Sequence, residues 1–132
     1  MLECRTISVS VARDWRDLYE RIRRPEAFPE WASGLADASL ARTGDGWTAQ
    51  GPEGPVRIVF TPRNDYGVMD HGVHLPGGRV VQVPMRVVRN GEGAEVMLTQ
   101  FRQPGMGDET FERDAEWIRR DLDALKALAE RG

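Results

Sequence analysis

His71 is the residue whose type and expected position best suit chemistry in an enclosed site. Residues 66–75 alternate so that His71 falls on the apolar side of an expected strand, between Met69 and Val73. Imidazole titrates near neutral pH, so His71 could orient a polar group of a ligand or act as a general acid or base. It could equally be a core histidine with one hydrogen-bond partner, and the residues alone leave these interpretations open.

The polar neighbours of His71 do not complete a catalytic dyad or a metal site. Asp70 adjoins it, but neighbouring residues of a strand point to opposite faces. Asp70 and His74 share the outer face, where four residues amount to ~13 Å, too far apart for one metal ion. The sequence also lacks Gly-x-Ser-x-Gly, HExxH and phosphate-binding glycine motifs. We therefore expect neither a metal nor a cofactor.

Gln100 and Arg102 are the other polar residues expected on the side of His71. A turn at residues 90–93 sets the last two strands in a register that adds Gln100 and Arg102 to the same face. Gln100 is then the candidate second polar group near His71. Arg102 is either a solvated residue at the rim or a group that captures a carboxylate at the mouth of a cavity.

The apolar candidates for a cavity lining include methionines and aromatic residues, which suit adaptable binding of apolar ligands. Each of them could also be an ordinary core residue. Residues 103–107, which contain two glycines, form either a portal to the cavity or a rigid corner. The expected ligand contacts are Trp31, Phe60, Met69, Val83, Met85, Leu98 and Trp117.

Residues 108–130 form the element that must position these side chains. At a rise of 1.5 Å per residue they predict a helix ~35 Å long, with Asp108 as its N-cap. Such a wide apolar face needs a sheet to lie on, and Trp117, Ala124 and Leu128 widen it further. Its apolar positions follow the i, i+3, i+4 spacing of one helical face: Phe111, Ala115, Ile118, Leu122, Leu125 and Ala129.

The preceding chain predicts two short helices and a series of antiparallel strands. Asp14 begins a helix that Pro25 ends, and residues 29–33 predict a second helical turn. A four-residue loop at 62–65 would place Phe60 opposite Gly67, and a three-residue loop at 76–78 would place His71 opposite Val83. Alternation and turn residues predict seven strands, at 3–11, 35–42, 46–50, 55–61, 66–75, 79–89 and 94–102.

Five segments carry a resemblance to a known family: Pro29-Glu30-Trp31-Ala32-Ser33-Gly34, Phe60-Thr61-Pro62-Arg63-Asn64, Gly67-Val68-Met69-Asp70-His71, Pro84-Met85-Arg86-Val87 and Phe101-Arg102-Gln103-Pro104-Gly105-Met106. Together with the order of elements, they resemble the helix-grip domain of the SRPBCC superfamily, which is START-like and includes a polyketide cyclase/dehydratase branch. The resemblance covers residues 1–132 and implies one α+β domain. In such a domain, a curved antiparallel seven-stranded sheet wraps around the C-terminal helix and encloses an apolar cavity.

Composition excludes several classes of partner. The net charge is -3 with acids and bases interspersed, which argues against nucleic acid. No apolar run approaches the ~18 residues that span a membrane, and the N-terminus lacks the pattern of a signal peptide. The single cysteine, Cys4, can form no internal disulfide, so we expect a reducing cytoplasm. A monomer and a homodimer are both compatible with the sequence.

These observations favour a cytoplasmic protein that binds a small apolar or aromatic molecule, rather than an enzyme. His71, Gln100 and Arg102 would orient the ligand. Two alternatives stay open because the SRPBCC fold serves many functions. One is a polyketide cyclase or dehydratase that uses His71 as its acid or base. The other is a protein-interaction module whose cavity is filled by side chains.

Overall fold

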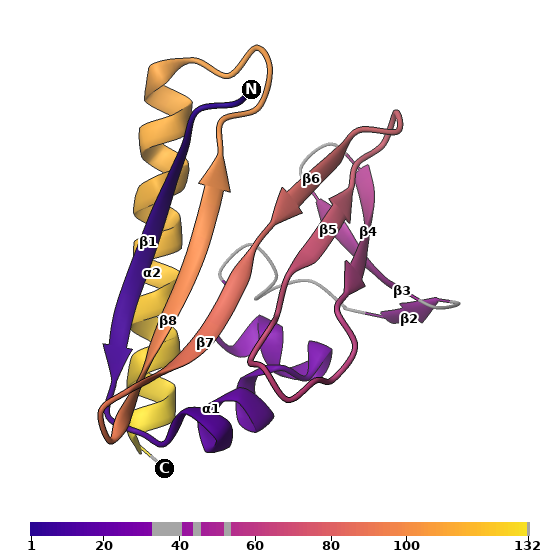
Figure 1. The fold of residues 1–132 in the computed structure, drawn as a ribbon. Helices are drawn as coiled ribbons and strands as arrows, with labels where there is room; N and C mark the ends of the chain where they lie inside the picture. The colour runs from indigo at the N-terminus through magenta and orange to yellow at the C-terminus, as the bar shows by residue number, and fades with distance from the viewer. Residues whose placement is uncertain (33–40, 44–45, 52–53, 132) are drawn as a thin grey trace.

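The computed structural model describes residues 1–32, 41–43, 46–51 and 54–131 (Figure 1). The predicted strand 35–42 lies almost entirely outside these residues. In chain order the elements are β1 (Cys4–Val11), α1 (Trp15–Ile22), the 3-10 helix η1 (Pro25–Glu30), β2 (Ala41–Thr43), β3 (Gly46–Gly51), β4 (Gly54–Phe60), β5 (His71–His74), β6 (Val80–Val83), β7 (Met85–Asn90), β8 (Gly93–Phe101) and α2 (Asp108–Arg131).

The described strands form two antiparallel sheets that meet at Pro84. One sheet has the order β1-β8-β7 and the other β2-β3-β4-β5-β6. Residues 79–89, predicted as one strand, are interrupted at Pro84, which has no N–H to give to a ladder. Thr99 N donates to Pro84 O at 2.9 Å, and beyond this bond β6 pairs with β5 while β8 pairs with β1. The break accounts for eight described strands where seven were predicted.

The predicted C-terminal helix is confirmed, and it lies along the three-stranded sheet (Figure 1). Strands β2–β6 spread away from it. Trp117 and Ala124, predicted to widen the apolar face, are exposed instead. The main core therefore lies between β1, β7, β8, α1 and α2. The buried residues of α2 are Phe111, Ala115, Leu122, Leu125 and Ala129.

The first helix is also confirmed, whereas the second helical turn begins earlier than predicted. Asp14 caps α1, because its Oδ2 accepts hydrogen bonds from the backbone N–H groups of Arg16 and Asp17. The helix ends at Ile22 with Arg23 as its C-cap, two residues before Pro25, which is the first residue of η1. Pro29 lies inside η1 rather than at its start, so the predicted turn at residues 29–33 was placed four residues too late.

The strand register is correct where the turns are short and wrong at one longer connection. His71 lies opposite Val83, as predicted, and β8 pairs with β7 so that Leu98 lies opposite Met85. Phe60 lies opposite His71 rather than Gly67, because ten residues, 61–70, connect β4 to β5. The shift of four positions is even, so the division between inner and outer faces is preserved.

Candidate functional site

A groove of about 740 Å³ lies where β6 leaves β8, against the side of α2. Figure 1 shows β6 turning away from β8 above the point where β7 begins. The apolar part of its wall comes from all the surrounding elements: Val73, Leu75, Val81, Val83, Leu98, Phe101, Met106, Trp117 and Ile118. This is the position expected for a cavity between the sheet and the C-terminal helix.

Four of the ten predicted ligand contacts line the groove. They are Val83 from β6, Leu98 and Gln100 from β8, and Trp117 from α2. Residues 103–107 also border it, as expected of a portal segment. The indole of Trp117 has half of its surface exposed, so it forms an accessible apolar wall.

Gln100 links β8 to the start of α2 through one end of its side-chain amide. Its Nε2 donates to the backbone oxygen of Phe111 at 3.1 Å. Its Oε1 is buried and has no hydrogen-bond partner among the described residues. A buried acceptor without a partner costs about 1–3 kcal/mol of stability. A purely structural link between β8 and α2 would not need this acceptor.

The charged side chains around the groove are mainly acidic. Asp114 and Asp121 come from α2, and Arg79 comes from the turn before β6, so the described part of the lining carries one net negative charge. Asp114 is 3.8 Å from Arg113 and stays partly exposed. The lining therefore favours neutral or cationic groups over carboxylates.

His71 does not reach this groove. Its ring packs against Phe28 and Phe60, with centroids 5.6 Å away in each case. Its Nδ1 lies 2.9 Å from the Met69 carbonyl oxygen, which can only accept, so Nδ1 carries the proton. The residue borders a separate shallow hollow of about 270 Å³ on the five-stranded sheet. The arrangement is that of a core histidine with one backbone partner.

Burial lowers the pKa of His71 below its usual range, although the Met69 carbonyl and the charge of Asp70 oppose this shift. The unfolded chain then binds a proton more readily than the folded one. Stability should fall as the pH drops from about 6.5 toward the lower folded-state pKa. We expect the unfolding free energy, measured by urea unfolding, to fall less between pH 7.5 and 5.5 in His71→Leu than in the wild type. His74→Gln, at an exposed position of the same strand, should behave as the wild type; an unchanged profile in His71→Leu would contradict the assignment.

Most of the other predicted contacts are core residues. Met85 is fully buried, and Met69 and Trp31 are each about 5% exposed. Phe60 packs edge-on against Phe28, with centroids 4.7 Å apart. These side chains point inward as predicted, but they are covered by α1, η1 and their neighbours rather than opening to the groove. The indole Nε1 of Trp31 is buried without a partner among the described residues.

Arg102 was proposed to capture a ligand carboxylate, but its guanidinium pairs with carboxylates of the protein. Its guanidinium lies 3.1 Å from Glu3 and 2.7 Å from Asp108, and its Nε donates to Met106 O at 2.9 Å. These contacts join the start of β1 to the connection that leads into α2. Arg102 thus stabilises the corner beside the groove and does not line it.

Asp70 faces away from His71, as the alternation predicted. Its carboxylate accepts hydrogen bonds from the backbone N–H of Met85 and from the Arg86 guanidinium, at 2.8–3.0 Å. The Arg86 guanidinium, with a smaller contribution from the Met85 N–H, holds the pKa of Asp70 below its usual range. No three His, Cys, Asp or Glu residues of the described chain are grouped so as to hold a metal ion.

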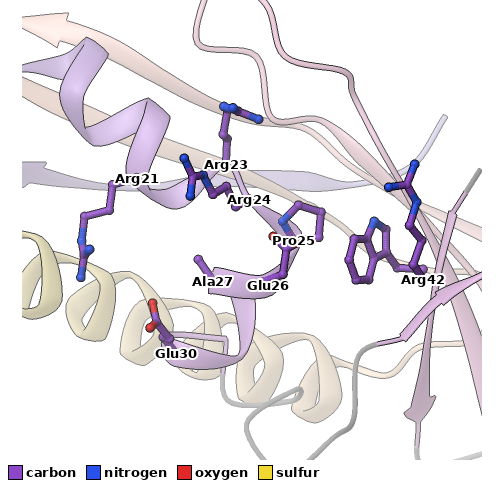
Figure 2. A pocket seen from close by; sticks show the side chains of 9 residues that line it. Arg21, Arg23, Arg24, Pro25, Glu26, Ala27, Glu30 and Arg42 are labelled. Atoms are coloured by element: carbon purple, nitrogen blue, oxygen red, sulfur yellow. The ribbon is translucent and has the colours of Figure 1, made fainter.

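A second hollow, of about 810 Å³, lies beside η1 and was not anticipated from the sequence (Figure 2). Four arginines and two glutamates border it, together with Trp47. Arg21 and Arg42 stand at opposite ends, and the guanidinium groups do not converge on one point (Figure 2). A small anion would therefore meet one arginine at a time. The signal available in the sequence was the cluster Arg21, Arg23 and Arg24 directly after the first apolar helix face.

The antiparallel sheets and the long C-terminal helix give the protein a helix-grip fold, as predicted. No family model and no curated protein matches the sequence. No helix of the described residues is both long and apolar enough to cross a membrane.

Several solved structures share this fold. XoxI from Bacillus cereus superposes with a TM-score of 0.74 over 97% of this chain and 96% of that chain, at 14% identity. Ara h 8.0201 superposes with a TM-score of 0.69 over the whole of both chains, at 8% identity. DynU16, a protein of the dynemicin biosynthetic locus, gives 0.67 over 94% of this chain and 46% of that chain, at 16% identity.

Proposed function

We propose that the protein binds a small apolar or aromatic molecule in the groove between β6, β8 and α2. The observation that carries the proposal is a hollow of about 740 Å³ with apolar walls contributed by both layers of the fold. Pockets that enclose small ligands typically measure about 300–1,000 Å³ and combine apolar walls with a few polar groups. Burial of apolar ligand surface would supply affinity of about 25 cal/mol per Å² before the costs of binding.

The placement of His71 and Gln100 supports a binding protein more directly than an enzyme. A cyclase or dehydratase that uses His71 needs this ring beside the substrate, together with a second polar group. His71 and Gln100 belong to different surroundings in the structure, since His71 contacts Phe28 and Phe60 while Gln100 lines the groove. The open groove also supports ligand binding over a protein-interaction module with a filled cavity.

Nile red, a neutral apolar dye that brightens in apolar surroundings, tests the proposal directly. We expect wild-type protein to bind it with one saturable site. Trp117→Ala should weaken binding by about tenfold, because the indole forms an apolar wall of the groove. The melting temperature should stay nearly constant, since half of this side chain is already exposed.

Tyr66→Ala is the matched control. Tyr66 is another exposed aromatic residue, 79% accessible, in the connection between β4 and β5 and away from the groove lining. Its removal should leave the dissociation constant of Nile red unchanged. No saturable binding by the wild type, or equal effects of the two substitutions, would refute the groove as the binding site.

A further inference from the structure

We infer that the groove selects a neutral or cationic ligand that donates a hydrogen bond to Gln100 Oε1, such as an aryl alcohol or aryl amine. This inference rests on the proposed function, because it concerns the same groove. It goes further by naming the polar chemistry that the ligand must carry.

The orientation of the Gln100 amide is fixed by its partner. The Phe111 carbonyl oxygen accepts hydrogen bonds and cannot donate them, so the group 3.1 Å from it is the NH₂. The carbonyl end of the amide is then the group that has no partner in the described part of the chain. An acceptor in this state gains most from a donor, whereas a second acceptor placed near it would be repelled.

Gln100 is only 8% exposed, and its free oxygen is out of contact with solvent. Bulk water therefore does not satisfy it in the structure as it stands. A ligand donor reaches this oxygen when neighbouring side chains of the groove wall shift. The side chain itself lines the groove, so the movement required is local and leaves the bond to Phe111 in place.

The charges of the groove point in the same direction. Asp114, Trp117 and Asp121 are spaced by three and four residues, so they share one face of α2 and border the groove together. Arg79 is the single basic residue of the described lining. A ligand carboxylate would meet both the unpaired Gln100 oxygen and this acidic helix face, which disfavours organic anions.

Three naphthalene probes of similar size separate these features. At pH 7, 2-naphthol is a neutral donor, 2-methoxynaphthalene is neutral without a donor, and 2-naphthoate is an anion. We expect the wild type to bind 2-naphthol about tenfold more tightly than 2-methoxynaphthalene, and 2-naphthoate most weakly, in isothermal titration calorimetry. A tenfold preference corresponds to one buried acceptor gaining its partner.

Gln100→Met tests the role of Gln100 Oε1 as the acceptor, because it keeps the length of the side chain and removes the amide. The preference for 2-naphthol over 2-methoxynaphthalene should fall to about twofold or less. Gln103→Met is the matched control: Gln103 also borders the groove and bonds a backbone carbonyl, Phe101 O at 3.0 Å, but its amide oxygen is not left buried without a partner. This variant should keep the wild-type preference.

The outcomes separate the inference from the proposed function. If the wild type binds all three probes without preference, the donor inference is wrong and the binding function stands. A preference that survives in Gln100→Met overturns the role of Gln100 in the same way. If none of the probes binds and Nile red does not bind either, both proposals fail. The comparison among probes in the wild type remains decisive even if Gln100→Met folds poorly.

Discussion

Gly67→Ala is expected to destabilise the protein by roughly 3–5 kcal/mol, a large part of the 5–15 kcal/mol typical of a domain. Gly67 has a φ of +72°, in the left-handed region that costs other residues about 1–2 kcal/mol. A Cβ at this position would also clash with the backbone oxygen of Val87. Because the carbonyl of Gly67 accepts the N–H of Val87 at 2.9 Å, neither backbone can retreat without breaking this bond.

Gly91→Ala separates the two contributions to this loss. Gly91 has a φ of +59°, in the same region, but no atom of the described residues lies within 4 Å of the position of its Cβ. We expect a loss of about 1–2 kcal/mol, which reports the backbone conformation alone. Urea unfolding at 25 °C gives both values. Equal losses in the two variants would show that the segment around Gly67 can move away from β7.

Asn64, in the same connection as Gly67, explains why the register of β4 with β5 escaped prediction. A loop of four residues was expected after Phe60, but Asn64 organises a much longer connection. Its Oδ1 accepts the N–H groups of Tyr66 and Val68, and its Nδ2 donates to the carbonyls of Pro62 and Val68. One side chain thus supplies the bonds that a hairpin would supply. Turn propensity recognises a turn here and does not measure its length.

The two α-helices and the short turns were predictable because their signals are local. Asp14 caps α1, and the apolar spacing of α2 extends over its whole length. The turns before β6 and β8 contain glycines with positive φ, such as Gly77 and Gly91, and their length fixed the register of His71 and Met85. Residue type and spacing were sufficient in these segments.

The site was predicted only in part, because alternation assigns a face and not a depth. Met69, Met85 and Val83 share the inner face, yet Val83 alone borders the groove. The difference arises at Pro84, where the sheet divides and β6 moves away from β8. A proline within a predicted central strand is a sequence signal for such a break. The position of the groove could have been inferred from it.

Phe111→Ala is the second substitution with a large expected effect, a loss of about 3–5 kcal/mol. Phe111 is one of the largest fully enclosed side chains, 2% exposed, in the first turns of α2. Its ring lies beneath the guanidinium of Arg5, 4.2 Å from the ring centre, with the guanidinium of Arg102 at 5.6 Å. Removal of the ring leaves a cavity and deprives two arginines of their packing surface, so the loss should exceed the transfer free energy of the side chain alone.

Phe111→Leu and Trp117→Ala are the comparison variants for the stability loss expected in Phe111→Ala. Leucine refills much of the space and should cost about 1–2 kcal/mol. Trp117 lies on the same helix but is half exposed, so its removal should change stability by no more than about 0.5 kcal/mol. Urea unfolding of the three variants gives the ranking. A loss below about 1 kcal/mol in Phe111→Ala would show that α2 is held mainly by its later turns, around Leu122 and Leu125.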